Sequence, residues 1–164
     1  YEKSRVLWCL PGLFRFWHSR FWRNIYIPAN FPNVDNASLY LGQFKQMWTE
    51  ENYNPRPIKS YSLQEYGLHS GWTAKKTFAA GQWYDVVVHA RWSMGDDGFY
   101  QMWVNGKQTA NDTGSNSFYN GEVAFRYGLY RYDVWAYNGE GPLPTQVVYF
   151  DSVRRSSTRS GLYN

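Results

Sequence analysis

The chain has 164 residues, a length that suits one domain, residues 1–164, with a sizeable core. Aromatic residues make up 21% of the chain and charged residues only 18%, which excludes a disordered protein and favours an all-β domain or a sugar-binding surface. The net charge of +4, from 17 basic and 13 acidic residues without a dense basic stripe, indicates an anionic partner and argues against a nucleic-acid binder.

Signals for targeting and for redox state are sparse. There is no run of 18 apolar residues and no charged segment followed by an apolar one as in a signal peptide, so we expect no membrane association. Cys9 stands alone and cannot form an internal disulfide. The glycosylation sequons at Asn36 and Asn111 suit a secreted protein, and we expect an extracellular monomer.

In chain order, short strand-like runs alternate with Gly, Asn, Asp and Pro. Residues 1–23 are apolar and aromatic without clean alternation, so this segment receives no assignment. Residues 49–76, which contain two prolines and two glycines, are predicted to be a long surface excursion. The polar tail, residues 156–164, is expected to fray. Strands are predicted at residues 24–28, 38–48, 83–93, 98–109, 122–131 and 145–153.

The clearest local unit is a β-hairpin around Asn105-Gly106, the pair that best tolerates the positive φ angles of a type I′ turn. Residues 83–93 and 145–153 are rich in β-branched and aromatic side chains, so both are predicted to be central strands. Short strands at this spacing predict an all-β fold, a two-sheet antiparallel sandwich or jelly roll.

Side-chain alternation divides each strand into an inward and an outward set. In residues 85–92 it places His89 and Arg91 together, away from the core. In residues 123–131 it places Arg126 and Tyr130 together, on the side opposite Phe125 and Leu129.

The same rule applied to residues 39–48 groups Gln43 and Lys45 with Leu39 and Leu41, opposite Tyr40 and Phe44. The three polar pairs are then candidates for one sheet face that accepts an anionic sugar chain. A solvated outer face with ordinary long side chains gives the same pattern, so alternation alone leaves both interpretations open.

The order of the motifs along residues 21–155 adds to this picture. The chain reads "FWRNIYIPANFP", "LYLGQFKQ", "WYDVVVHARWS", "GFYQMWVNGKQ", "FRYGLYR" and "VVYFDSVR". This order resembles the β-jelly-roll polysaccharide lyases, which include glucuronan lyases, heparin-lyase-I-like enzymes and alginate lyases. The resemblance implies a concanavalin-like jelly roll and β-elimination at a uronic acid residue of a polysaccharide.

The resemblance also implies roles for particular residues. Relatives carry Gln-aromatic-His and Phe-Lys-x-Gly-x-Tyr motifs, matched here by residues 43–45 and 125–130, with Lys45 in place of His and Arg126 in place of Lys. Gln43 would contact the uronate carboxylate, and Tyr130 would act as base, as acid or as both. The remaining candidates are His89 as a second base and, for substrate binding, Arg126, Lys45, Arg91, Gln101 and Arg5.

Alternatives remain open at this point. A non-catalytic carbohydrate-binding module or lectin on the same sandwich is the second hypothesis, and an adhesion domain of laminin-G-like shape is the third. No cofactor is required for the predicted reaction. Asp96, Asp97 and Asp151 are candidates for a structural calcium site because adjacent acids in loops can bind that ion.

Overall fold

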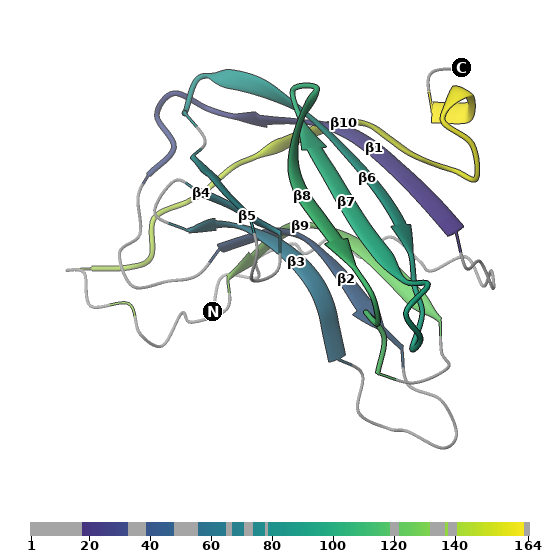
Figure 1. The fold of residues 1–164 in the computed structure, drawn as a ribbon. Helices are drawn as coiled ribbons and strands as arrows, with labels where there is room; N and C mark the ends of the chain where they lie inside the picture. The colour runs from purple at the N-terminus through teal and green to yellow at the C-terminus, as the bar shows by residue number, and fades with distance from the viewer. Residues whose placement is uncertain are drawn as a thin grey trace.

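The computed structural model describes residues 18–32, 39–47, 56–64, 67–70, 74–77, 79–118, 122–131, 137 and 141–162. Across these residues the chain forms two five-stranded sheets (Figure 1). Sheet A has the strand order β10 (Tyr149–Ser156), β1 (His18–Ile27), β6 (Gln82–Arg91), β7 (Phe99–Val104) and β8 (Lys107–Thr113). Sheet B has the order β5 (Ala74–Thr77), β4 (Gly67–Ser70), β3 (Arg56–Gln64), β2 (Leu39–Gln46) and β9 (Val123–Arg131).

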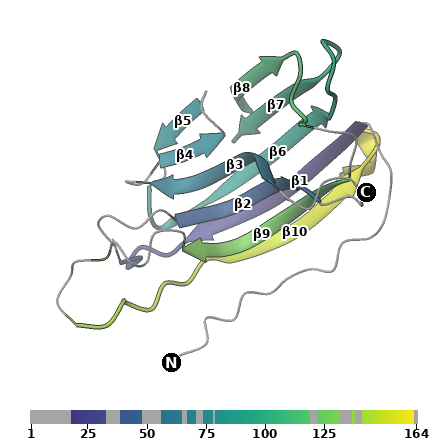
Figure 2. The ribbon, with the colours of Figure 1, turned by 90° about the horizontal axis from the view of Figure 1, so that it is seen from below.

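All pairings of neighbouring strands in the two sheets are antiparallel. The sheets lie in two layers, with β2 between β3 and β9 in the layer nearer the viewer of Figure 2. The described residues therefore confirm the predicted all-β, two-sheet antiparallel sandwich. Among them no helix is long and apolar enough to cross a membrane.

Alternation of side chains in β6 places one face of this strand in the core. Val86, Val88 and Ala90 are buried, whereas the residues between them are only partly covered. The buried set joins aromatic and aliphatic residues of both sheets in one core between the layers. The prediction of a central strand in this part of the chain is confirmed.

The hairpin between β7 and β8 is also confirmed. Asn105 has φ 50° and Gly106 has φ 73°, the two positive values that a type I′ turn requires. The main-chain N–H of Asn105 donates to the Asp85 carbonyl, and the Asn105 side chain accepts a bond from the Asp85 N–H. This turn is therefore tied to the neighbouring strand β6.

Four local predictions differ from the structure. The segment 49–76 contains β3, β4 and β5 and is not one surface excursion. Strand β1 begins at His18, inside the unassigned segment, and β10 is an edge strand of sheet A instead of a central one. The tail does not simply fray, because the 3-10 helix η2 (Ser160–Leu162) buries Leu162 completely. Its carbonyl also accepts a hydrogen bond from Arg154 Nη1 at 3.2 Å.

The alternation predicted for β2 is broken in its middle. The pairing of β2 with both β3 and β9 shifts by one residue between Tyr40 and Gly42. Because a one-residue shift exchanges the two faces of a strand, Leu39 and Leu41 are buried in the core together with Phe44. The grouping of Gln43 with the two leucines was therefore wrong.

Candidate active site

Aromatic packing in the core fixes β2 against β9. Phe44 is fully buried, and its ring stacks on Phe125 of β9 with 4.8 Å between centroids and 27° between planes. Phe21 of β1 contacts both rings, at 5.1 Å and 4.9 Å. Burying such rings contributes about 1.5–3 kcal/mol each. The contacts of these rings hold the two strands in register and so determine which outward residues meet.

The outward face of β2 and β9 brings four of the polar residues of sheet B together. Gln43 lies directly opposite Arg126, and Tyr40 lies directly opposite Tyr130. The Tyr40 and Tyr130 rings have centroids 6.1 Å apart, and the Tyr130 side chain is 43% exposed. Directly opposite residues on antiparallel strands have Cβ atoms about 4.5–5.5 Å apart, so each pair can contact one ligand group. We call Tyr40, Gln43, Lys45, Arg126 and Tyr130 the sheet B polar cluster.

Lys45 completes this cluster at the next outward position of β2, where it lies opposite Ala124. Partial burial and the nearby charge of Arg126 lower the pKa of Lys45 below its ordinary value. Two cations so close together repel each other. A bound carboxylate would relieve this repulsion, so the arrangement favours an anionic ligand.

Gly128 separates the amide and cation pair from the tyrosine pair along β9. It has φ 137°, a backbone conformation that favours glycine, and no atom of the described residues lies within 4 Å of a Cβ added there. There is thus open space on the sheet face between Arg126 and Tyr130. The absence of a Gly128 side chain leaves the backbone uncovered at this point.

The structure does not bring His89, Arg91 and Gln101 to this cluster. They belong to β6 and β7 of sheet A, and Gln101 lies opposite His89 in the pairing of these strands. Their side chains alternate with buried residues, so they lie on the outer face of sheet A, on the far side of the sandwich from the sheet B polar cluster. The prediction that all three polar pairs share one face was wrong, and His89 does not lie beside Tyr130.

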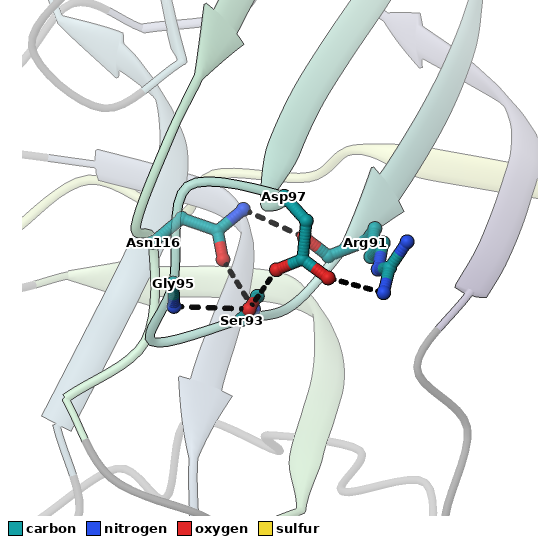
Figure 3. Close-up of polar contacts among 5 residues, drawn as sticks. All are labelled: Arg91, Ser93, Gly95, Asp97 and Asn116. Carbon is teal, nitrogen blue, oxygen red and sulfur yellow. Dashed lines mark hydrogen bonds and ion pairs between the residues drawn. The ribbon is translucent and has the colours of Figure 1, made fainter.

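The outer residues of sheet A have other local contacts. The His89 ring packs edge-on against Phe99 with 4.7 Å between centroids, and Gln101 Nε2 donates to Asn111 Oδ1 at 3.0 Å. Arg91 forms an ion pair with Asp97 (Figure 3). These contacts support the strand edges and loops of sheet A.

The loop between β6 and β7 explains the role of Asp97. Its carboxylate accepts a bond from the Ser93 hydroxyl, and this bond together with the Arg91 charge lowers the pKa of Asp97. Asn116 holds the same loop: Nδ2 donates to the Arg91 carbonyl at 2.9 Å, and Oδ1 accepts from the Ser93 N–H at 2.8 Å (Figure 3). Nδ2 also donates to the Phe99 carbonyl at 3.0 Å.

The contacts of this loop do not support the predicted calcium site. No group of three or more potential metal ligands occurs in the part of the chain that the structure describes. Asp97 already contacts Arg91 and Ser93. The structural calcium stays a prediction. Arg5, the remaining predicted substrate ligand, lies outside the described residues.

Comparison with known proteins assigns the family. The chain matches the sequence model described as polysaccharide lyase over residues 15–154. This chain belongs to the polysaccharide lyase family.

Solved structures of lyases share the fold. An endo-β-1,4-glucuronan lyase from the fungus Trichoderma reesei superposes with a TM-score of 0.69 at 16% identity, over 92% of this chain and 73% of that one. An alginate lyase from Pseudomonas aeruginosa gives a TM-score of 0.56 at 13% identity, over 85% and 64% of the two chains. A search of curated proteins finds no match. The structural likeness confirms the predicted jelly roll.

Sequence reasoning missed two residues of this polysaccharide lyase family member. Tyr40 belongs to the sheet B polar cluster, but uninterrupted alternation places it on the core side. Arg23 of β1 is 2% exposed, with its guanidinium 4.7 Å from the centroid of the Phe125 ring. Burial lowers the pKa of Arg23 well below its ordinary value. Arg23 thus supports, from the core side, the strand that presents Arg126 outside.

Proposed function

We propose that this chain is a polysaccharide lyase that cleaves an anionic, uronate-containing polysaccharide by β-elimination. One observation carries the proposal: Gln43 opposite Arg126 and Tyr40 opposite Tyr130 on a single sheet face. The family match and the glucuronan and alginate lyases that share the fold support it. We include secretion in the proposal, because long uronate polymers are extracellular material.

The proposed chemistry has two requirements that the sheet B polar cluster can meet. The C5 proton of a uronate becomes acidic only when the charge of the adjoining carboxylate is neutralised, and the amide of Gln43 with the cations of Arg126 and Lys45 would do this. A base must then remove the C5 proton while the C4–O bond breaks. The electron pair of the C5–H bond forms the C4–C5 double bond, and a proton returns to the leaving oxygen.

Tyr130 is the group that we assign to proton transfer. It lies on the same outward face as Arg126, two positions beyond the open space at Gly128. A phenolate at Tyr130 would take the C5 proton, and the phenol so formed would give a proton to the glycosidic oxygen. One residue can serve both steps because each transfer restores the form that the other requires.

A second candidate function is a non-catalytic carbohydrate-binding module on the same face. Lys45 favours it, because the Gln-aromatic-His motif implied by the resemblance has His where this chain has Lys. Such a module would bind the same anionic chain through Gln43, Lys45 and Arg126 without turnover.

The test combines a substrate panel with matched variants. Glucuronan, alginate and glycosaminoglycans are incubated with the protein while the ultraviolet absorbance of the unsaturated uronide is followed. We expect turnover on at least one polymer, and a fall in kcat of about 10²–10⁴-fold in Tyr130→Phe, because a positioned proton-transfer group contributes that much. His89→Gln on sheet A is the matched control and should keep the wild-type rate.

Each result decides between the two functions. Binding of a uronate polymer without product across the panel would reject the lyase and leave the binding module. Turnover that survives in Tyr130→Phe but fails in His89→Gln would overturn the assignment of the site to sheet B.

A further inference from the structure

The outer face of sheet A carries a row of aromatic residues that the lyase site does not use. Tyr26 of β1 lies directly opposite Trp83 of β6 and directly opposite Tyr149 of β10. The Tyr26 ring lies 5.2 Å from the Trp83 ring and 6.0 Å from the Tyr149 ring, measured between centroids. Three adjacent strands thus present three neighbouring rings, which we call the aromatic row.

The aromatic row is open to solvent at both ends. Trp83 is 50% exposed and Tyr149 is 54% exposed. Single exposed apolar residues are normal on protein surfaces, whereas contiguous exposed rings indicate an interaction site. The faces of such rings carry negative charge density and stack against the C–H groups of sugar rings. Rings on successive strands, here 5.2 Å and 6.0 Å apart, match a ligand whose units repeat along a line.

The next row of the same face supplies hydrogen-bonding groups. Asn24 of β1 lies opposite Asp85 of β6 and opposite Asp151 of β10. Asp151 is exposed, and Asp85 is held in place by a hydrogen bond from Trp22 Nε1. Carboxylate oxygens accept hydrogen bonds from sugar hydroxyls and repel anionic groups. The nearby cation Arg154 lies over the Trp22 ring at 5.4 Å and donates to the Leu162 carbonyl.

We propose that the aromatic row and the adjoining Asn24, Asp85 and Asp151 bind a neutral polysaccharide chain. The two carboxylates distinguish this end of the outer face of sheet A from the cationic cluster on sheet B, so the two surfaces select polymers of different charge. The proposal does not depend on the lyase reaction, because it concerns the opposite sheet and a different ligand. Its consequence is that one molecule holds a neutral chain on one face and a uronate chain on the other.

The experiment uses two soluble polymers with one backbone. Hydroxyethyl cellulose is neutral and carboxymethyl cellulose is anionic, and each is cast into native gels that measure retardation of the full chain. We expect hydroxyethyl cellulose to retard the wild type, and the Trp83→Ala and Tyr149→Ala variants to weaken that binding by about fivefold or more, as for central aromatic contacts. Asp85→Asn is expected to raise the affinity for carboxymethyl cellulose.

The control variant is Phe118→Ala, which removes another exposed ring, 56% exposed and outside the aromatic row. It should bind hydroxyethyl cellulose as the wild type does, and thermal melting should show all variants folded. The proposal is overturned if the wild type does not bind hydroxyethyl cellulose. It is also overturned if a Trp83→Ala/Tyr149→Ala double variant binds this polymer as strongly as the wild type does. A wild-type dimer that the double variant converts to monomers would also overturn it and would assign the row to a second copy of this chain.

Discussion

The replacement Gln43→Glu tests the proposed carboxylate site most directly. In the wild type, a neutral amide lies opposite Arg126. The variant places a carboxylate at the same position with almost no change in volume. The new charge attracts Arg126 and repels the substrate carboxylate, so the same substitution should favour the folded protein and oppose catalysis.

The expected loss of kcat/KM can be worked out from the repulsion between the new carboxylate and the substrate carboxylate. A carboxylate about 4 Å from the substrate carboxylate interacts with about 1 kcal/mol in a water-like medium and about 4 kcal/mol at the effective dielectric of a protein surface. Since Gln43 and Arg126 are both partly buried, the effect lies between these limits. At 1.36 kcal/mol for each tenfold, kcat/KM should fall by about fivefold to about 1,000-fold. The cross-strand ion pair adds only about 0.2–1 kcal/mol to folding stability.

The assay follows unsaturated product at several salt concentrations, together with thermal melting. We expect Tm to stay unchanged or to rise, and added salt to restore part of the lost rate, because mobile ions screen a partly exposed charge. Gln101→Glu is the matched control, since it makes the same change on the outer face of sheet A. An unaltered kcat/KM in Gln43→Glu, or an equal loss in Gln101→Glu, would refute the carboxylate site on sheet B.

Two further predictions concern the charge of Lys45 and the tail. Because burial and Arg126 lower the pKa of Lys45, its cation is lost at a lower pH than that of an ordinary lysine, so kcat/KM should decline as pH rises through this pKa. Lys45→Arg should move that decline to higher pH, whereas abolished activity would indicate a neutral lysine base instead. Leu162→Ala should lower the free energy of unfolding by about 2 kcal/mol, the lower end of the range for a buried leucine, because a terminal segment can relax. Calorimetry should then show a Tm lower by about 4–8 °C. An unchanged Tm would show that the packing of the tail does not contribute to stability.

The sequence predicted correctly which side chains face outward where alternation is regular. In β9 the outward positions of Arg126 and Tyr130 and the inward positions of Phe125 and Leu129 follow the period of a strand. In β2 the shift after Tyr40 reversed the assignment of that residue. Gly42 stands at the shift, and a glycine inside a strand pattern can indicate a bulge, but its presence alone does not fix where neighbouring strands change register.

The misplacement of His89 has a different cause. Alternation tells which side of a strand faces away from the core, and it did so correctly for His89. A sandwich, however, has two outer faces, and alternation within one strand contains no information on the sheet to which the strand belongs. That information is in the pairing of β6 with β1 and β7, which involves residues far apart in sequence.

Gly128 has a consequence for how the site can change during evolution. No atom of the described residues would contact a Cβ there, yet its φ of 137° would strain any residue other than glycine. Selection for a stable fold therefore keeps the sheet face open, independently of selection for activity. A descendant that lost the Tyr130 hydroxyl would still present an uncovered surface beside the cations Lys45 and Arg126. In this lineage, sugar binding would outlast catalysis.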